Sequence, residues 1–420
     1  MNRVTLSLAF LAFLAGVVGC NKTADIKVEE ENPLEEMEAQ PILLSKAEEN
    51  VAASANTFGL EVFRQLVSAQ KGEDVLFSPF GLSLNLSLCA GGGEAETKSQ
   101  ILSTLGFSKW KADDVASYFK SVSEGLLCVD PSSKFLCANS VWVDKNYTLE
   151  DAFKDYASDS FKAELTSLDL LKKESLGAIN RWCADHTEGK IAKVVDDSRD
   201  PEVRSVSYLL NALYFNGGWQ FPFDEKPQEG TFHGQSGDRL VSYLQNEEHY
   251  QYYETEKARL VSLPYGNCSY SLVVALPKDG IGLSEMMNSL DAMTLFTGSR
   301  HDLIRLRLPK FEMEYNTGDE LVPVLKKLGM TVPFQAGQAD FSSMFKGSAP
   351  FYIEKLFQKT VITVDEKGTE AAAATFNTIL MSNGETNPPV LRTLTVDRPF
   401  AFALVENTSK TILFLGQKVL

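Results

Sequence analysis

Residues 363–389 read TVDEKGTEAAAATFNTILMSNGETNPP, and the two halves of this stretch favour different structures. The first half holds four consecutive alanines, the best helix formers, with Thr369 as a candidate N-cap and Glu370 in the first turn. The second half holds Asn-Gly and Pro-Pro, which indicate a loop. Taken alone, the stretch predicts a short helix followed directly by a long loop, close to the end of the chain.

The composition is that of a globular protein with an acidic surface. The chain has 420 residues, of which 44% are apolar and 10% aromatic, enough for one large domain or two ordinary ones. The formal net charge is -16, and Lys and Arg form no basic run. Because phosphate binding needs clustered cations, this charge argues against a nucleic-acid partner.

The N-terminal segment is typical of a secretory signal. Residues 1–19 carry Arg3, then an apolar run too short for a comfortable membrane span, then small residues. The end of this segment, VVGC at residues 17–20, resembles the lipobox of bacterial lipoproteins, in which the signal is cut before a cysteine that carries the lipid. An ordinary signal peptide with an incidental Cys20 is the alternative.

Residues 20–45 are polar and acidic, so we expect a flexible tether. With a lipid on Cys20, the resemblance implies a protein secreted across the inner membrane and anchored in the outer membrane. The run KVEEE at residues 27–31 looks like the acidic signals that send some lipoproteins to the cell surface, although such runs are usually only solvated. Whether the protein faces the periplasm or the outside therefore stays open.

A single domain over residues 46–420 is the simplest interpretation, because no Gly/Ser/Pro-rich linker and no repeat interrupts them. The first half has apolar residues mostly at helical spacing. After residue 205 the chain changes to short β-branched and aromatic runs bounded by Gly, Pro or Asn, which indicate strands. Helices first and strands later, without strict alternation, predict an α+β fold with large, mostly antiparallel sheets.

No pattern for an enzyme or a metal site stands out in the sequence. No cysteine pair has structural-zinc spacing, and none of the four histidines is a helical neighbour of another: His186, His233, His249 and His301. The sequence also lacks a G-x-S-x-G elbow, a G-x-G-x-x-G turn and a P-loop. We therefore expect no catalytic residue, no metal and no cofactor.

Besides Cys20 the chain has five cysteines, an odd number that leaves at least one free thiol in an oxidising compartment. Cys89 and Cys183 lie in helical apolar patterns and are expected to be small buried hydrophobic residues. Cys128 and Cys137 are candidates for a disulfide, which the sequence leaves open.

Several motifs along the chain resemble those of one family. INRWCADHTEGKI at residues 179–191 and LLNALYFNGGWQFPF at residues 209–223 are long and specific, and TVDEKGTEAAAATF at residues 363–376 resembles a hinge. LPYGN, LPKFEMEY, DRPFAFALVEN and TILFLGQ also occur in the same order as in that family. Together these motifs resemble the serpin family of protease inhibitors over about residues 46–420.

The resemblance implies an α+β fold of about nine helices around three mostly antiparallel β-sheets, with an exposed reactive-centre loop at about residues 366–396. It also implies a function that needs no catalytic residue of its own. A target protease attacks the loop as a substrate and forms an acyl-enzyme. The cut loop then inserts as an extra strand into the largest sheet, which carries the protease away and distorts its active site.

The hinge of this loop is expected to comprise Glu366, Gly368, Thr369, Glu370 and the alanines Ala371, Ala372, Ala373 and Ala374. An inserting strand needs small, uncharged side chains where it faces the core. With a period of two, Thr369, Ala371, Ala373 and Thr375 share one face, and Glu370 falls on the other. This pattern favours an inhibitor over the alternative, a non-inhibitory serpin-fold binding protein that is cleaved as a plain substrate.

In inhibitory serpins the bond that is cut usually follows the seventeenth residue counted from the hinge glutamate, here Glu366. The count predicts the bond Ser382-Asn383, with Met381-Ser382 as the alternative. Small and apolar residues there suit elastase-, chymotrypsin- or subtilisin-like serine proteases, and also papain-like cysteine proteases. No Arg or Lys lies between Lys367 and Arg392, which argues against a trypsin-like target.

The resemblance places Ser78, Asn211, Trp219 and Gln358 where the sheet opens. The family normally has a histidine bonded to an asparagine there, and Gln358 stands at the histidine position. Because glutamine both donates and accepts, we expect an Asn211–Gln358 hydrogen bond without the pH sensitivity of imidazole. The expected partners are target proteases, with membrane contact only through the lipid on Cys20, and we expect a monomer.

Overall fold

The computed structural model describes residues 40–70, 72–198, 200–201, 205–298, 301–347, 351–354, 356, 358–369 and 391–419. The chain divides into two parts, residues 1–37 and 38–420, and the structure below is that of the second part. Its described residues form eight α-helices and fifteen strands. The predicted α+β class is therefore confirmed.

Most helices come from the first half of the chain, as the apolar spacing there predicts. They are α1 (Lys46–Ala69), α2 (Pro79–Gly92), α3 (Ala95–Thr104), α4 (Ala112–Gly125), α5 (Asp151–Phe161) and α6 (Lys173–His186). The second half adds α7 (Leu283–Ser289), α8 (Leu321–Lys327) and two 3₁₀ helices, η1 (Ala292–Phe296) and η2 (Val332–Phe334). None of the helices in the described ranges combines the length and the apolar character that a bilayer crossing needs.

The starts of α1 and α2 follow directly from local sequence. At α1, Ser45 Oγ accepts from the Glu48 amide and the Glu48 carboxylate accepts from the Ser45 amide, which is a complete capping box. At α2, Ser78 Oγ accepts from the Gly81 amide, and Pro79 occupies the first helical position, where its missing N–H costs nothing. Almost every residue of α2 is buried, so this helix lies inside the fold.

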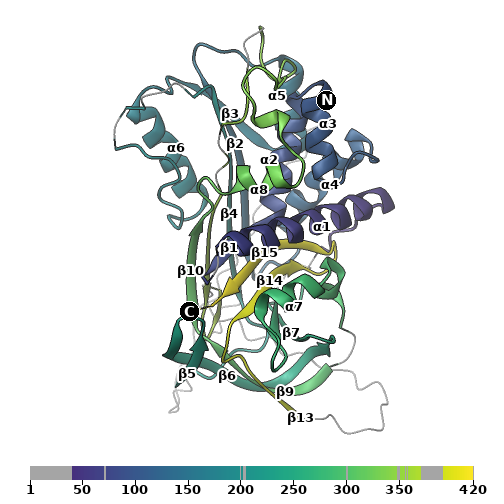
Figure 1. Ribbon diagram of the computed structural model, residues 1–420, viewed down its shortest axis with the longest axis vertical. Helices are drawn as coiled ribbons and strands as arrows, with labels where there is room; N and C mark the ends of the chain where they lie inside the picture. The colour runs from purple at the N-terminus through teal and green to yellow at the C-terminus, as the bar shows by residue number, and fades with distance from the viewer. Residues whose placement is uncertain are drawn as a thin grey trace, which may run out of the picture. The chain divides into compact units, whose positions relative to one another are not determined.

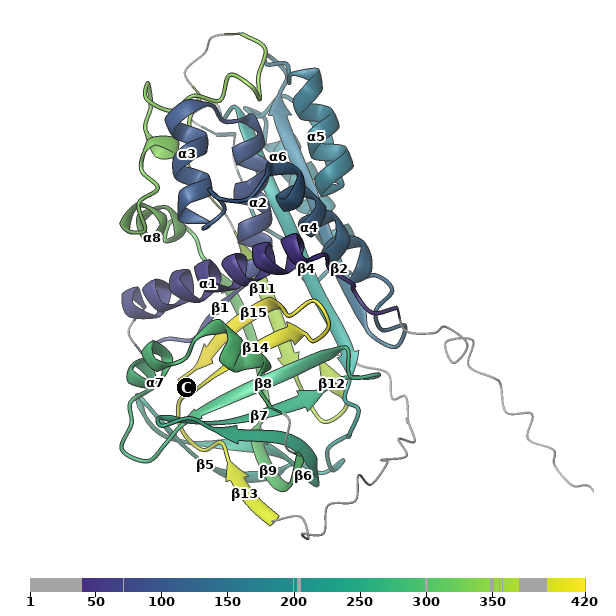
Figure 2. The same cartoon turned by 90° about the vertical axis from the view of Figure 1, so that its right-hand side faces the viewer.

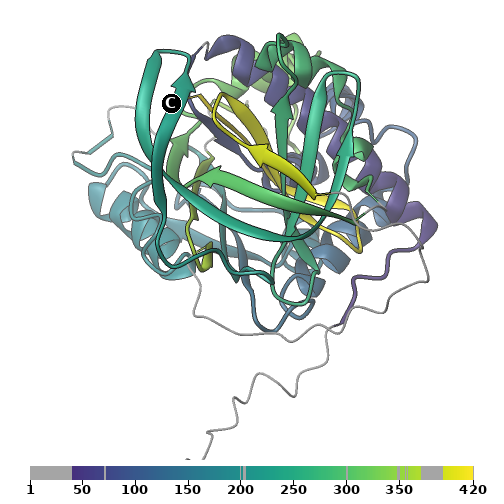
Figure 3. The same cartoon turned by 90° about the horizontal axis from the view of Figure 1, so that it is seen from below.

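The largest sheet has nine strands, and only the pair β13–β9 within it is parallel among the described pairings. Along the sheet the strands are β1 (Val75–Phe77), β15 (Thr411–Lys418), β14 (Phe400–Glu406), β8 (Tyr270–Pro277), β7 (Ala258–Pro264), β6 (Gly237–Glu254), β9 (His301–Pro309) and β13 (Leu391–Thr395). Strand β5 (Gln228–Gly234) pairs with β6 beside this path. Figure 3 shows the strands of this sheet from below.

The described residues contain two further sheets. One has the order β12 (Gly368–Thr369), β4 (Ser207–Gly218), β2 (Lys134–Asp144) and β3 (Ala163–Leu168). The other is the antiparallel pair β10 (Phe311–Asn316) and β11 (Lys359–Val364). The antiparallel ladder of β2 and β4 runs from Lys134↔Asn216 to Val143↔Ser207. With the nine-stranded sheet, the described residues contain three hydrogen-bonded sheets.

Helices cover both faces of the β4–β2 ladder. On one face Trp182 and Ile179 of α6 form an apolar cluster with Trp142 of β2 and Leu210 of β4. On the other face α2 packs against β4, where Gly81 lies beside Asn211. In both side views α1 lies between the helices α2 to α5 and the strands β14 and β15 (Figure 1 and Figure 2).

The segment before α1 is packed on the domain. Ile42 is only 5% exposed, and its amide donates to Thr408 Oγ1 at 3.0 Å. A Cβ on Gly125 would lie 2.6 Å from Ile42 Cγ1, so the isoleucine fits because that position is glycine. The folded part therefore begins before the expected boundary at residue 46. The polar composition of residues 20–45 gave no sign that one of them, Ile42, is buried against the domain.

Candidate functional site

The four-stranded sheet and the β10–β11 pair lie side by side at β4 and β11, but these two strands form no ladder with each other in the described residues. Within the described residues, β4 pairs with β2 along one side and with the two-residue strand β12 along the other, whereas β11 pairs with β10. We call this missing ladder between β4 and β11 the sheet gap. Figure 2 shows β12 at the C-terminal end of β4, at one end of the sheet gap.

The two edges of the sheet gap are held under a common cover. Val361 of β11 packs against the same apolar cluster under α6 that includes Leu210 of β4. The Lys359 ammonium, at the start of β11, donates to the carbonyl of Lys193 in the segment that follows α6. The interruption is therefore a feature of backbone pairing, while side chains keep the two edges close together.

A tight turn carries the chain from β11 into the sheet gap. The Asp365 amide donates to the Gly368 carbonyl at 2.9 Å, and Asp365 Oδ1 accepts from the amides of Lys367 and Gly368. Gly368 has φ +152°, and a Cβ on it would lie 2.1 Å from the Gly217 carbonyl oxygen. Only glycine allows the turn to approach β4 this closely.

The turn leads directly into antiparallel pairing with β4. Gly368 lies opposite Gly218, and Thr369 lies opposite Gly217. Thr369 is 1% exposed, and its hydroxyl shares a hydrogen bond of 2.8 Å with Tyr265. The side chain of Thr369 therefore faces the core, as the parity of the predicted hinge requires.

Trp219 covers the hinge turn from outside the sheet gap. Its indole N–H donates to the Asp365 carbonyl at 2.8 Å, and its amide donates to the Lys367 carbonyl at 3.0 Å. The indole ring stacks on Tyr265 with 4.2 Å between centroids and 17° between planes. One aromatic pair thus holds both the turn and Thr369, the second residue of β12.

Glu366 ties the same turn to the neighbouring strands. Its carboxylate pairs with the Lys310 ammonium at 2.8 Å, and its carbonyl accepts from the Phe223 amide. Burial alone would raise the pKa of the Glu366 carboxyl, but the hydrogen bond from Lys310 and nearby positive charge lower that pKa below its ordinary value. The carboxylate is therefore ionised at neutral pH and serves as a fixed anchor for the hinge.

Trp219 thus lies at the hinge, whereas the other predicted sheet-opening residues, Ser78, Asn211 and Gln358, lie apart from it near the start of α2. Gln358 lies just before β11, and its side chain binds the backbone of Ser78 at both ends. Gln358 Oε1 accepts from the Ser78 amide at 2.6 Å, and Gln358 Nε2 donates to the Ser78 carbonyl at 2.9 Å. Both groups are buried, so β11 is pinned at its start to the N-terminus of α2.

The expected Asn211–Gln358 hydrogen bond is wrong. Among the described residues, Asn211 Nδ2 donates to Asn139 Oδ1 at 2.7 Å, and Asn211 Oδ1 has no hydrogen-bond partner. Gln358 is held by the backbone of Ser78, and this pairing satisfies two main-chain groups at the start of a buried helix. The amide and carbonyl of Ser78 therefore determine the orientation of the Gln358 side chain.

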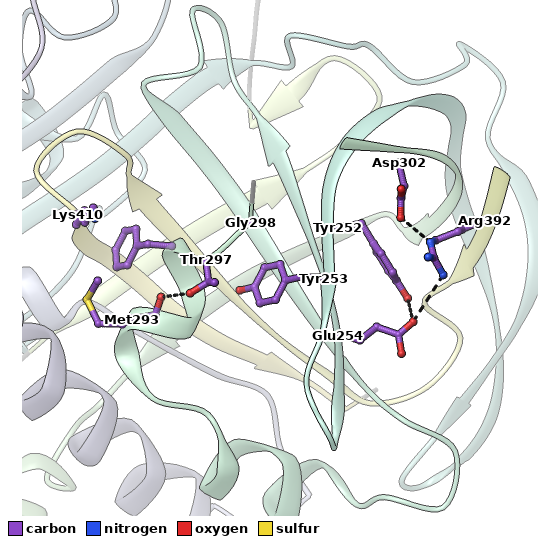
Figure 4. Close-up of a pocket in the computed structure, with 10 residues that line it drawn as sticks. Tyr252, Tyr253, Glu254, Met293, Thr297, Gly298, Asp302, Arg392 and Lys410 are labelled. Atoms are coloured by element: carbon purple, nitrogen blue, oxygen red, sulfur yellow. Dashed lines mark hydrogen bonds and ion pairs between the residues drawn. The ribbon is translucent and has the colours of Figure 1, made fainter. Parts of the chain in front are cut away.

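The far end of the loop is held by a separate ion pair. Arg392 at the start of β13 donates to the Asp302 carboxylate at 2.6 Å, and the Asp302 side chain is only 2% exposed. The guanidinium also lies over the Tyr252 ring, 5.1 Å from its centroid, with Glu254 4.0 Å away. These residues line an open cleft of about 710 Å³, which Figure 4 shows with Met293 and Thr297 on its other side.

The remaining predicted site residues lie outside the described residues: Glu370, Ala371, Ala372, Ala373, Ala374, Met381, Ser382, Asn383 and Cys20. The structure adds Tyr265 and Lys310, which the sequence interpretation did not include in the site. Tyr265 lies in the LPYGN motif and Lys310 in the LPKFEMEY motif. Both motifs supported the resemblance, but neither shows by itself that its residue contacts the hinge.

The described cysteines are all free thiols. Cys89 and Cys183 are buried, as expected for small hydrophobic residues. Cys128 and Cys137 do not pair with each other: Cys128 is exposed, and Cys137 accepts a hydrogen bond from Asn211 at 3.5 Å. Burial raises the pKa of the Cys137 thiol to about 12, so it stays protonated at neutral pH.

The comparisons with known proteins all indicate the same family. Residues 53–419 match the family described as Serpin (serine protease inhibitor). The chain is 31% identical over 378 residues to plasminogen activator inhibitor 1 from Bos taurus, which covers 87% of this chain and 91% of that protein. It is 29% identical over 385 residues to intracellular coagulation inhibitor 2 from Tachypleus tridentatus, with coverages of 88% and 91%.

Solved structures agree with these relatives. The thermophilic serpin tengpin in its native state is similar with a TM-score of 0.79 at 29% identity, covering 93% of this chain and 99% of that chain. The matched residues include the whole sheet gap, the hinge turn and the contacts at Ser78. By fold, motif order and family match, this chain belongs to the serpin family.

Proposed function

We propose that this serpin inhibits proteases by inserting its own cleaved loop into the sheet gap. The observation that supports this most directly is the hinge. The chain has already reversed direction after β11, and Gly368 and Thr369 already pair with β4 as the first two residues of an added strand. Insertion then extends a pairing that exists before cleavage.

The length of β4 sets how far this pairing can extend. Thr369 lies opposite Gly217, and β4 begins ten residues earlier at Ser207. In the same register, Ile379 would lie opposite Ser207. Ten added residues would form about ten ladder hydrogen bonds at roughly 1 kcal/mol net each, so insertion can release on the order of 10 kcal/mol. That free energy would drive the distortion of an attached protease.

The side chains of the loop suit this path. Thr369 faces the core, so alternate residues after it, Ala371 and Ala373, would face the core as well. Glu370 would fall on the opposite face, where a charge costs less. Small inward residues at the leading end of the strand favour an inhibitor over a binding protein that is only cleaved.

We propose Ser382-Asn383, or Met381-Ser382, as the bond that the target protease attacks. The target class that fits a small or apolar residue before this bond is an elastase-, chymotrypsin- or subtilisin-like serine protease. Papain-like cysteine proteases also accept apolar residues near the cut. A trypsin-like target is disfavoured, because no basic residue lies between Lys367 and Arg392.

The test is to mix the protein with elastases, chymotrypsin, subtilisin, cathepsins and trypsin, and to follow both protease activity and complexes on a denaturing gel. A covalent complex near the summed mass, formed at the loop, is expected with at least one enzyme other than trypsin. Mass spectrometry of the released peptide then locates the cut. Loop cleavage by every enzyme without any covalent complex would refute inhibition and leave the binding-protein alternative.

We also propose that Cys20 carries a lipid that anchors the protein in the outer membrane. The support is the VVGC sequence and the polar segment that follows it. Replacing Cys20→Ala should move the protein from the membrane fraction to the soluble fraction, and should abolish metabolic labelling with a fatty acid. Retention of label and of membrane association in the variant would refute the anchor.

A further inference from the structure

Large apolar side chains that are exposed are few in the part of the chain that the structure describes. The three most exposed of them are Leu43 at 83%, Leu240 at 68% and Leu127 at 64%. Single exposed apolar side chains are ordinary, whereas several at one place indicate a contact surface. Leu240 lies in β6, but Leu43 and Leu127 border one contact between two segments that are far apart in the sequence.

This contact joins the segment before α1 to the end of α4 (Figure 2). The Gln40 amide donates to the Cys128 carbonyl at 3.5 Å, and the buried side chain of Ile42 packs against the last residue of α4. Leu43 follows Ile42 directly, and Leu127 lies between that helix end and Cys128. Cys128 is exposed as well. We call Leu43, Leu127 and Cys128 the leucine patch.

Charged side chains beside the leucine patch are already paired. Lys46 at the start of α1 pairs with Glu49 at 2.8 Å, and Glu124 near the end of α4 pairs with Lys162 at 3.1 Å. A carboxylate that keeps its cation loses less on approaching an apolar medium than a lone one. Lysine side chains can also lay their apolar stems along a lipid surface and keep the ammonium in water. These two carboxylates therefore do not stop the patch from meeting lipid.

The course of the chain decides what the leucine patch would contact. Gln40 is separated from Cys20, the residue proposed to carry the lipid, by a stretch that can span at most about 70 Å when fully extended. A lipid surface that holds Cys20 is thus always within reach of the patch, whereas a protein partner would first have to be met by diffusion. Residues 21–39 are mostly polar and acidic, so they are a poor cover for leucines.

We propose that the leucine patch inserts into the interfacial region of the bilayer and fixes the orientation of the domain on the membrane. The inference rests on the lipid anchor on Cys20 proposed above. An anchor at the far end of a long segment leaves the domain free to rotate, and a second contact where that segment meets the domain removes this freedom. Leucines are among the side chains that enter the bilayer boundary. Even half of the transfer free energy of two leucines favours the docked form by about 10- to 100-fold.

The test uses the full lipid-bearing chain in vesicles of phosphatidylethanolamine and phosphatidylglycerol. A polarity-sensitive fluorophore is attached to Cys128 in a Cys268→Ser background, because both of these thiols are exposed. Quenchers on the lipid chains report contact of the fluorophore with the bilayer, and cosedimentation with the vesicles reports the anchor separately. The test variant combines Leu43→Asn with Leu127→Asn. The matched control is Leu240→Asn, which removes a similarly exposed leucine from another surface.

We expect quenching in the wild type and in Leu240→Asn, and a ratio of quenched to unquenched label that is lower by about 10- to 100-fold in the double variant. Cosedimentation without quenching, or the same quenching in the double variant and the wild type, would overturn the inference and leave the anchor standing. A label that is already shielded in Cys20→Ala protein without vesicles would show that the protein covers its own patch, which also overturns the inference. If the wild type does not cosediment, the anchor and the inference are both overturned.

Discussion

Replacing Thr369→Arg should convert this protein from an inhibitor into a substrate of the same protease. Thr369 is 1% exposed and hydrogen-bonded to Tyr265, so an arginine there would have to bury its charge under the sheet for insertion to begin. The facing residues of β4 are Gly217 and Gly218, which offer no carboxylate to pair with that charge. The charge would enter the sheet without a partner.

The size of this penalty follows from the cost of a buried charge. Placing an unpaired ion in the interior costs several kcal/mol, on the order of 3–5. A barrier raised by that amount slows insertion by roughly 100-fold to several thousand-fold. Hydrolysis of the acyl-enzyme competes with insertion, so a slower insertion releases active protease. The number of inhibitor molecules consumed per protease inactivated should therefore rise more than about tenfold.

The intact variant should remain folded. Withdrawal of Thr369 from β4 loses one hydrogen bond with Tyr265, worth roughly 0.5–1.5 kcal/mol, and the rest of the domain does not depend on a two-residue strand. The thermal midpoint of the intact protein checks this. A folded variant that fails to inhibit then isolates the insertion step.

The assay is a titration of residual protease activity against inhibitor concentration, with gel analysis of the covalent complex. Glu370→Arg is the matched control, because the next residue of an extended strand points to the opposite face. The control should inhibit almost as well as the wild type. Unchanged stoichiometry in Thr369→Arg, or equal losses in both variants, would refute the assignment of Thr369 as the first core-facing residue of the inserting strand.

Three further perturbations test the contacts around the sheet gap. Gln358→Ala should lower the free energy of unfolding by roughly 1–3 kcal/mol in urea, because the buried Ser78 amide loses its acceptor, whereas the Ser78 carbonyl keeps the Leu82 amide as a donor. Lys310→Met should cost roughly 0.5–1 kcal/mol at pH 7, measured by thermal unfolding. The pKa of Glu366 is lowered from 4.5 in the folded protein, so this ion-pair contribution is present above pH 4.5 and is lost as the pH falls through the lowered pKa. Arg392→Gln should weaken the contact with the buried Asp302 carboxylate and destabilise the β13 edge by roughly 1.5–3 kcal/mol, seen as faster proteolysis at the edge strand.

Each of these three predictions would be contradicted by a specific result. A Gln358→Asn variant that is as stable as the wild type would contradict the two-ended contact with Ser78, because the shorter side chain cannot make both bonds. A Lys310→Met loss that is as large near pH 3 as at pH 7 would show that packing, and not the charge of Glu366, stabilises the hinge. Arg392→Lys with wild-type protease resistance would show that β13 needs only a positive charge there.

The hinge could be located from sequence because its signal is local. Insertion of a strand needs small residues with a period of two, a glycine at the pivot and no charge on the core-facing side, and all of these occur between Glu366 and Ala374. The contacts that hold the hinge could not be located in this way. Tyr265 and Lys310 are 104 and 56 residues away from their hinge partners, and nothing in their local sequence marks them as neighbours.

The long strand β2 was also missed by the sequence interpretation, which treated the first half of the chain as mostly helical. Residues 134–144, KFLCANSVWVD, form an eleven-residue strand paired with both β3 and β4. One face of the strand adds Trp142 to the apolar cluster under α6 and the other adds Val141 and Val143 to the main core, so apolar residues do not alternate cleanly with polar ones along it. A strand buried on both faces lacks the period of two that identifies a strand in sequence.

The α+β class, the family and the inward face of Thr369 could be predicted from the sequence, because they depend on motif order and on local periodicity. Which polar groups meet could be seen only in the fold. Asn211 and Gln358 each carry one donor and one acceptor group, and composition alone allowed them to bond to each other. In the fold, the Ser78 amide, which has no partner within its own helix, lies within reach of Gln358, and Asn139 lies directly across the ladder from Asn211. Proximity in the fold therefore selects the hydrogen-bond partners of both side chains. It leaves Asn211 Oδ1 without a donor among the described residues, on the strand β4 along which the loop would insert.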